Sequence, residues 1–329
     1  MLNFSLPIKD KFSIEGYIDG LLLIQKQKSY TGNYWRLNGL ILCNPSIRKS
    51  RRLPPPAYSH LSISTVFHIG FGFDSSINDH KVVIVQYPYP PVRHMEGACP
   101  SFCVEIFSLK ANIWKSIWDK TSCLICSGGK AFVNGAIHWL GEDRLASPQV
   151  IKGKGSHIVS FDVSNETFRY TELPDIDQRG DLEHEGYSSF VIDLCGSLGL
   201  VDCFKTETCI WTMKRDSWTK HCTIDLEKVD NIYAIDDGRL LLSQLRIKLL
   251  KWYDLKSGQI IPVHTQEHAC LEEFADVFVE SLFWSKRDDA PPIVIPSLNG
   301  IKRKPRVKHR GYYRRIMVRR NASNSRQQT

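Results

Sequence analysis

The sequence contains no apolar run approaching the ~20 residues that a membrane-spanning helix needs. Its first residues, MLNFSLPIKDKF, also lack the basic region and the following apolar stretch of a secretory signal. We therefore expect a cytoplasmic or nuclear protein without a membrane partner. In a reducing compartment the ten cysteines stay as thiols. Most of them, such as Cys43, Cys103 and Cys203, stand in apolar segments where they serve as small core residues.

Acidic residues are missing from the last part of the chain. Residues 301–329 hold eleven Lys or Arg and no Asp or Glu. The other 300 residues contain 32 of the 43 basic residues against all 35 acidic ones, which gives them a net charge of −3. The overall charge of +8 is thus the charge of a tail on a nearly neutral body. A neutral body argues against a specific nucleic-acid partner.

Complete motifs for a metal, a cofactor or catalysis are absent as well. Cys123 and Cys126 have the spacing of half a zinc site, but no second pair exists, so we interpret them as structural. The segment GFGFDSS (70–76) lacks the lysine and the following helix of a phosphate loop, and its last three residues are expected to form a loop before a strand. The segment from Asp175 resembles a calcium loop, but it has Arg at the fifth ligand position and Gly at the twelfth. No GxSxG elbow is present, and we interpret His138 as a hydrogen-bonded core residue. We predict no cofactor and no metal.

Long amphipathic helices are scarce. Residues 269–284 are the best candidate, although their second half fits a strand equally well. Short segments instead alternate with period two, so that Phe102, Val104 and Ile106 share one face. Clusters of Gly, Pro, Asp and Ser separate these segments. Many evenly spaced strands predict a sandwich, a barrel or a propeller.

One unit recurs five times and favours the propeller. It consists of an apolar strand, an Asn, Ser or Asp, a short polar turn and a second strand. The copies occupy residues 40–54, 104–117, 157–174, 209–224 and 249–263. Their equivalent positions, Cys43, Phe107, Phe161, Met213 and Tyr253, are separated by 64, 54, 52 and 40 residues. Propeller blades repeat every ~40–50 residues, with insertions in loops.

A second hairpin precedes several of these units. It occurs at residues 17–24, 131–141, 190–201 and 233–242. Asn134–Gly135 and Asp237–Gly238 are pairs that supply the positive φ of type I′ turns. Each repeat is therefore a hairpin, a loop and a second hairpin, which makes a blade of four antiparallel strands.

We predict an all-β, kelch-like or galactose-oxidase-like β-propeller over residues 12–290, with six blades or an incomplete ring. Residues 1–11 form a lead, and residues 291–329 form a disordered basic tail. Large aromatic residues are expected to be buried in the wedge-shaped space between blades. These residues are Trp114, Trp139, Phe161, Trp218, Trp252 and Phe283.

The sequence resembles the F-box associated domain of plant F-box proteins, a propeller-like module. Six blocks carry the resemblance in the order of the family, between about residues 16 and 286. They are Asp19–Leu22 with Cys43–Leu53, Gly70–Val83 (GFGFDSSINDHKVV), Val104–Lys115, Val133–Leu140 (VNGAIHWL), Ile158–Pro174 and Asp216–Lys220 (DSWTK). The basic tail has no counterpart in the family.

The resemblance implies a substrate receptor of an SCF-type ubiquitin ligase, which is a protein-interaction module and not an enzyme. Its partners would be a target protein and, if an F-box lies upstream, a Skp-type adaptor and a cullin. No segment of the chain reads like the Leu-rich F-box that docks on that adaptor, so coupling to the ligase depends on such an upstream segment. The alternative is a propeller enzyme, a hydrolase or a lyase, with its active residues on central loops.

Partner contact is expected on an exposed loop, because propellers present binding residues at the end of a central channel. The Pro-rich insertion at 87–100 offers aromatic, basic and sulfur-containing anchors. These are Tyr87, Tyr89, Arg93 and Met95. A variable loop without a partner is the alternative interpretation.

The basic tail generates a prediction about localisation. Its first ten residues contain Lys302, Arg303, Lys304, Arg306, Lys308 and Arg310. Such a run can act as a nuclear-import signal, as a nonspecific polyanion contact, or have no selected role. If it is an import signal, residues 297–329 carry a reporter too large for passive diffusion into the nucleus, and changing the first three basic residues to Ala keeps the reporter out. A cytoplasmic wild-type fusion, seen by fluorescence microscopy, would exclude the import interpretation.

Overall fold

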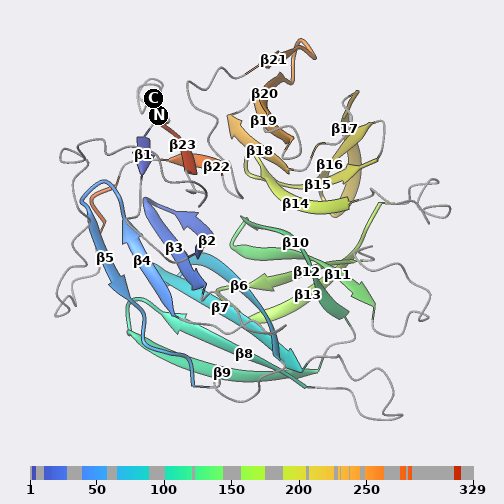
Figure 1. The fold of residues 1–329 in the computed structure, drawn as a ribbon. Coiled ribbons are helices and arrows are strands. Elements are labelled where there is room, and N and C mark those ends of the chain that lie inside the picture. Colours follow the sequence, from blue (N-terminus) through green and yellow to red (C-terminus); the bar gives the residue numbers. More distant parts are fainter. Residues whose placement is uncertain are drawn as a thin grey trace, which may run out of the picture.

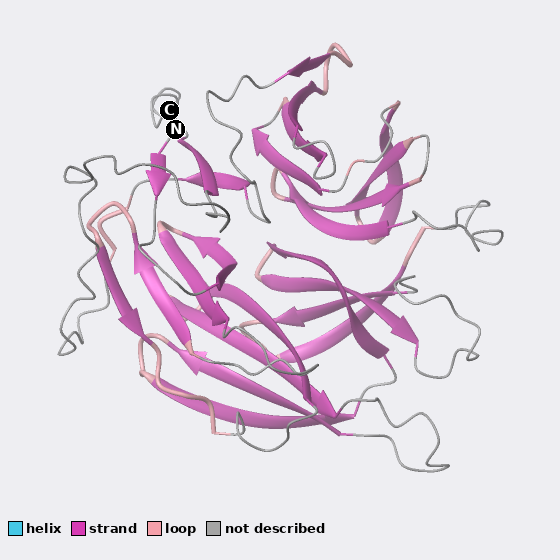
Figure 2. Ribbon diagram, in the orientation of Figure 1, coloured by secondary structure: helices cyan, strands magenta, loops and turns pink. Residues whose placement is uncertain are grey.

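The structure is a computed structural model in which every regular element among the described residues is a β-strand (Figures 1 and 2). The described residues are 2–4, 11–27, 39–57, 65–88, 101–120, 123–143, 157–174, 188–204, 207–225, 229, 231–236, 238–244, 249–262, 275–278, 281–283 and 315–319. The expected all-β class is thereby confirmed, and the arrangement of the strands into blades confirms the propeller.

Five four-stranded antiparallel sheets form the blades, and each is a consecutive stretch of the chain. Blade 1 contains β2 (Lys11–Ile18), β3 (Leu21–Gln27), β4 (Leu40–Asn44) and β5 (Lys49–Arg52). Blade 2 contains β6 (Thr65–Asp74), β7 (Asp79–Pro88), β8 (Ser101–Ser108) and β9 (Ile113–Lys120). Blade 3 contains β10 (Cys123–Val133), β11 (Ala136–Asp143), β12 (His157–Asp162) and β13 (Thr167–Glu172). Blade 4 contains β14 (Ser188–Leu194), β15 (Ser197–Cys203), β16 (Thr208–Lys214) and β17 (Ser217–Ile224). Blade 5 contains β18 (Asn231–Asp236), β19 (Arg239–Gln244), β20 (Leu249–Asp254) and β21 (Ile260–Pro262).

The prediction of six blades or an incomplete ring is corrected, because the described residues form a ring with five four-stranded blades. Between the fifth blade and the first lies a sheet in which three described strands pair, β22 (Ala275–Phe278), β23 (Arg315–Arg319) and β1 (Leu2–Phe4) (Figure 1). Strand β23 is parallel to β22 and antiparallel to β1, so this sheet joins both ends of the chain. Its strands come from distant parts of the sequence, and the five-fold repeat of the blade unit does not contain them.

Two of these strands lie in segments for which the sequence predicted a different structure, either a helix as one of two alternatives or a disordered tail. Strand β22 falls in the middle of residues 269–284, where the structure has a strand and not the helix that the sequence offered as the alternative. Strand β23 places residues 315–319 of the expected disordered tail in a sheet. The other residues of that tail lie outside the described part of the chain.

The repeated Asn, Ser or Asp of the blade unit caps a tight turn. The Asp162 carboxylate accepts hydrogen bonds from the backbone N–H groups of Ser164 (2.9 Å) and Asn165 (2.8 Å). Asp254 binds Ser257 N–H in the same way (2.7 Å), as these short polar side chains do in Asx turns. The equivalent caps in other hairpins are Asn44, Asp74 and Ser108.

The first two strands of blades 1, 3 and 4 are joined by turns of the predicted type I′, whereas Asp237 of the pair predicted in blade 5 lies outside the described residues. Asn134 and Gly135 have φ values of 50° and 76°. Asp19–Gly20 and Cys195–Gly196 also have positive φ at both positions. Their twist matches that of the strands they join.

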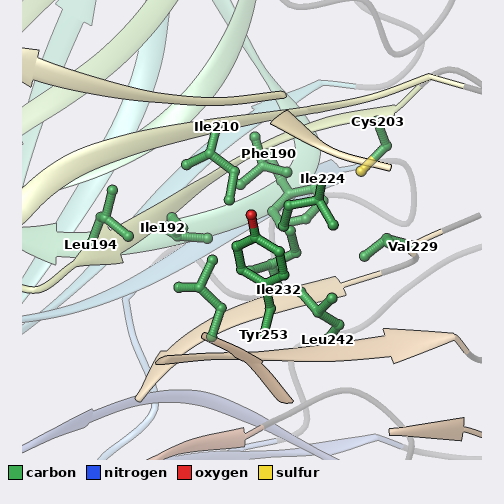
Figure 3. Close-up of a cluster of buried hydrophobic side chains, with 12 residues drawn as sticks. Phe190, Ile192, Leu194, Cys203, Ile210, Ile224, Val229, Ile232, Leu242 and Tyr253 are labelled. Carbon is green, nitrogen blue, oxygen red and sulfur yellow. The ribbon is translucent and has the colours of Figure 1, made fainter. Parts of the chain in front are cut away.

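Apolar side chains between adjacent blades form the core. Between blades 4 and 5, twelve buried residues, among them Phe190, Ile210 and Tyr253, form one cluster (Figure 3). Gly70 and Gly72 of β6 allow blade 3 to approach blade 2. A Cβ atom on Gly70 would lie 2.7 Å from Ile137 Cγ2, and one on Gly72 would lie 2.7 Å from Val163 Cγ1. The glycines of GFGFDSS are therefore packing residues in a strand, and residues 75–78 form the expected turn before β7.

The predicted aromatic wedges are found with one exception. Trp139 and Phe161 are buried, and Trp114, Trp218 and Trp252 are half-buried. The indole N–H groups of Trp114 and Trp218 each donate to a carbonyl of the preceding blade, at Pro54 (2.8 Å) and at residue 172 (2.8 Å). Phe283 is 41% exposed, because it follows β22 on the surface and does not lie between two full blades.

Residues after β22 close the ring against blade 1. The side-chain amide of Asn44 donates to the carbonyls of Ser281 and Phe283, both at 2.9 Å. The same side chain caps its own turn by accepting from Ser46 N–H (2.9 Å). The Phe283 ring lies 4.9 Å from the His80 ring of blade 2, measured between centroids.

We predict that Asn44→Ala lowers the free energy of unfolding by about 1–3 kcal/mol, because it removes a buried side chain that donates to two carbonyl groups across the closure and caps its own turn. Asn165→Ala is the matched control, since that exposed asparagine bonds to Asp162 within its own turn. The comparison is made by urea denaturation. Equal losses in the two variants would show that the bonds to residues 281 and 283 add nothing to closure.

Candidate interaction faces

Strand polarity gives the ring two different faces. Within each blade, the first and second strands and the third and fourth strands are joined at one end by tight turns, which we call the turn face. The second and third strands are joined at the opposite end, which we call the loop face. Connections on the loop face span residues 28–39, 89–100 and 144–156. Strands β7 and β8, which flank the candidate contact segment 89–100, therefore meet that segment at the loop face.

The predicted partner residues are only partly placed. Tyr87 belongs to β7, near the end of that strand on the loop face. Tyr89, Arg93 and Met95 lie outside the described residues. The same holds for the tail residues Lys302, Arg303, Lys304, Arg306, Lys308 and Arg310.

Among the other candidate residues, His138, Cys123 and Cys126 lie in described strands. His138 is hydrogen-bonded to Ser160 Oγ (2.8 Å) and to the Val133 carbonyl (3.2 Å), as expected for a core histidine. Burial lowers its pKa. Cys123 and Cys126 lie on β10, and residues 175–185 lie outside the described part. Within that part, no group of three His, Cys, Asp or Glu side chains could hold a metal ion, and no helix could span a membrane.

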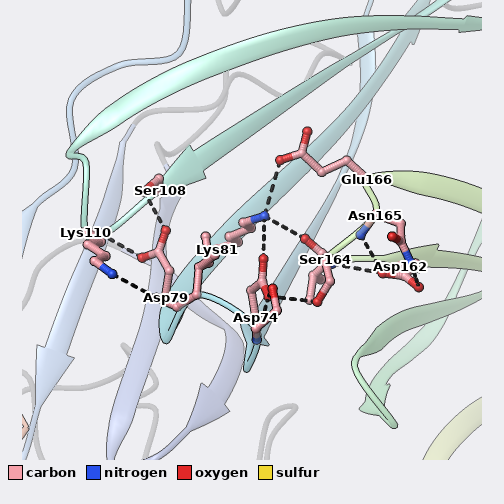
Figure 4. Close-up of polar contacts among 12 residues, drawn as sticks. Asp74, Asp79, Lys81, Ser108, Lys110, Asp162, Ser164, Asn165 and Glu166 are labelled. Atoms are coloured by element: carbon pink, nitrogen blue, oxygen red, sulfur yellow. Dashed lines mark hydrogen bonds and ion pairs between the residues drawn. The ribbon is translucent and has the colours of Figure 1, made fainter.

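A polar network on the turn face joins blades 2 and 3, and sequence reasoning did not find it (Figure 4). The Lys81 ammonium group binds the Asp74 carboxylate at 2.9 Å, the Val163 carbonyl at 2.7 Å and the Glu166 carboxylate at 3.2 Å. Ser164 Oγ also donates to Asp74 (2.8 Å). Because an ammonium group has three donors, these contacts saturate Lys81.

The charged groups of this network stabilise one another across blades 2 and 3. Burial alone would raise the pKa of Asp74, but hydrogen bonds from Ser76, Lys81 and Ser164 and the charge of Lys81 hold it below its usual value. The pKa of Glu166 is also lowered, because bonds from Lys115 and Lys81 outweigh its burial. Burial opposes the charged form of Lys81, yet its two carboxylate partners raise its pKa. A lysine with a raised pKa and no free donor is suited to holding blades together and not to proton transfer.

A second polar cluster lies where the inner strands β2, β6 and β10 approach one another. The Lys130 ammonium group binds the Glu15 carboxylate and the Ile69 carbonyl, the latter at 2.8 Å. Ser13 Oγ donates to Glu15 (2.5 Å). Burial and the charge of Lys130 lower the pKa of His68 to about 4. These charges are paired across three blades and therefore fix the inner strands in register with one another.

Comparison with known proteins points to one family. The sequence model of the F-box associated beta propeller domain matches residues 4–288. The F-box protein CPR1 of Arabidopsis thaliana is 28% identical over 279 residues, covering 76% of this chain and 65% of that protein. The F-box/kelch-repeat protein At3g23880 of the same plant is 25% identical over 253 residues, covering 74% of this chain and 63% of that protein. The chain thus spans less than two thirds of the length of these relatives. The solved structure of virginiamycin B lyase from Staphylococcus aureus matches with 14% identity and a TM-score of 0.43, covering 85% of this chain and 79% of that one.

We predict that Lys81→Met lowers the free energy of unfolding by about 3–5 kcal/mol, because it leaves the buried Asp74 carboxylate without its cation. Lys115→Met is the matched control. Lys115 also binds Glu166 (2.5 Å), but its side chain is 61% exposed, so its loss costs at most about 1 kcal/mol. Chemical denaturation measures the free energy of unfolding of both variants. Similar losses in the two would contradict a stabilising role for the buried bonds of Lys81.

Stability should also fall in acid. The folded-state pKa values of Asp74 and Glu166 are lower than the unfolded values of about 4. Their contribution is therefore complete above about pH 5 and is lost as the pH falls through the folded values. Thermal unfolding followed between pH 6 and pH 2 should show a falling midpoint, with a smaller fall in Lys81→Met. A fall of the same size in that variant would assign the acid sensitivity to other groups.

Proposed function

Because the chain belongs to the family of F-box associated β-propeller domains, we propose that it is a non-catalytic module that recruits a target protein for an SCF-type ubiquitin ligase. The family match over residues 4–288 is the observation that carries this proposal. The relatives are F-box proteins by name, which favours an interaction module over a propeller hydrolase or lyase. A Skp-type adaptor and a cullin join the complex where an F-box segment accompanies the propeller.

The two faces of the ring differ in their connections, and this difference supports target contact on the loop face. On the turn face the described turns are short and internally hydrogen-bonded, as at Asp162 and Asp254. Their backbone groups are already satisfied, so they offer few to a partner. The loop face carries the longer connections, which can vary in sequence without disturbing the blades. We assign target contact to the loop face, with Tyr87, Tyr89, Arg93 and Met95 as anchors.

Strand polarity adds a second argument. Strand β2 runs from the loop face to the turn at Asp19–Gly20. Strand β22 runs in the same sense, since residues 281–283 follow it and contact Asn44 on the turn face. Strand β1 is antiparallel to β23, which is parallel to β22, so Leu2 lies toward the turn face. A segment joined before Leu2 leaves from that face, opposite the target.

The proposal is tested by affinity capture of the tagged full chain from plant cells. We expect a reproducible set of captured proteins that is reduced at least fivefold when the four anchor residues are changed to Ala. The control is Asn165→Ala with Lys256→Ala, which alters exposed turn-face residues. If the anchor variant captures the same proteins in the same amounts as the control, the loop is not the contact. If no protein is captured reproducibly, recruitment itself is refuted.

A further inference from the structure

Strand β9 carries an exposed tryptophan near its end on the loop face. Trp118 is 59% exposed, whereas the other tryptophans of the described residues are buried or half-buried. It pairs with Cys103 of β8, and Cys103 pairs with Gln86 of β7. Strands β7 and β8 meet the candidate contact segment at this end of blade 2. Trp118 therefore lies on the face to which target contact is assigned.

The blade unit does not require a tryptophan at this position. Trp114, four residues earlier on β9, packs against blade 1, and its N–H group donates to a carbonyl of that blade (2.8 Å). Trp218 makes the same contact between blades 4 and 3 (2.8 Å). Four residues after the equivalent positions, blade 3 has Glu172 and blade 4 has Cys222. Packing between blades thus accounts for Trp114 and leaves Trp118 unexplained.

A buried carboxylate lies beneath Trp118. Glu105 and Cys103 alternate on β8, and Cys103 pairs with Trp118, so the three side chains share one face of the blade. Glu105 is fully buried and accepts a hydrogen bond from the side-chain amide of Gln86. Burial and the charge of Glu105 raise the pKa of the Cys103 thiol to about 11. This negative charge favours a cation as the group that contacts Trp118 from outside.

Cations cover two other tryptophan rings of this protein. Lys220 Nζ lies 5.9 Å from the ring centroid of Trp211, and the Arg239 guanidinium group lies 5.2 Å from that of Trp252. Both distances are within the ~6 Å over which the face of an indole attracts a cation. A guanidinium group is planar and weakly hydrated, so it stacks on an aromatic face more readily than an ammonium group does. An exposed indole above a buried carboxylate is therefore suited to an arginine.

We propose that Trp118 is the anchor for an arginine side chain of the target protein. The guanidinium group stacks on the indole ring at the end of blade 2 on the loop face. Tryptophan and arginine are the residues that most often carry the binding energy of an interface. This inference rests on the proposed recruitment function and names a residue type that the target must present.

The test uses a phage-displayed library of random ten-residue peptides panned on the full chain. Enriched peptides are synthesised with a fluorescent label, and their affinity is measured by fluorescence anisotropy. We expect a shared arginine, and an affinity about tenfold weaker for Trp118→Ala, as for the loss of a desolvated cation–π contact. Trp118→Phe keeps an aromatic ring and should lose less. Ile113→Ala is the matched control, because Ile113 is 62% exposed on the same strand at the turn face; it should leave the affinity unchanged.

A double-mutant cycle tests the contact itself. Changing the shared arginine of a peptide to glutamine should weaken binding to the wild-type chain. The Trp118→Ala chain should bind both peptides equally, because the two groups act as a pair. Independent losses would place the arginine elsewhere and would overturn the proposal. Enriched peptides without a shared arginine, or peptides that bind Trp118→Ala as well as the wild type, would also overturn it.

Capture from plant cells separates this proposal from the recruitment function. Trp118→Ala should retain less of the proteins that the wild-type chain captures, and Ile113→Ala should retain all of them. If Trp118→Ala captures the same proteins in the same amounts, the role of Trp118 is overturned and recruitment stands. If the wild-type chain captures nothing reproducibly while the arginine peptides depend on Trp118, recruitment fails and the arginine contact stands.

Discussion

Every blade of this protein has two apolar faces, and each face needs a neighbour to cover it. The sheet of blade 2 packs Phe107 against blade 1 and Val104 with Ile106 against blade 3. A sheet of this kind is not stable alone, because half of its apolar side chains would meet water. The blades therefore depend on the closed ring for their stability. The closing contact, in which Asn44 binds residues 281 and 283, stabilises the packing between all of the blades.

Polar groups between blades determine how the sheets are aligned, while the apolar faces supply the driving force. Apolar packing tolerates small shifts of one sheet along another. The bonds from Lys81 to Asp74, Val163 and Glu166 do not, since each has a fixed length and direction. Lys130 does the same between the inner strands. Charged residues inside this propeller thus define the rotation from one blade to the next.

The same architecture separates rigid and variable parts. Turns at one end are closed by side-chain caps, and longer connections leave from the other. A recruiting module needs this separation, because its contact loops must change with the target while the frame stays the same.

The sequence by itself determined the strands, the hairpins and the blade unit, because these depend on local alternation and on turn residues such as Asn134–Gly135. It also indicated the family through six ordered blocks, and it identified Trp139 and Phe161 as core residues. Only the tertiary structure decided the number of blades, since β1, β22 and β23 meet from opposite ends of the chain. It also decided the partners of Lys81 and the exposure of Phe283 and Trp118. These depend on which sheet lies opposite, and no local pattern encodes a contact between residues 82 positions apart.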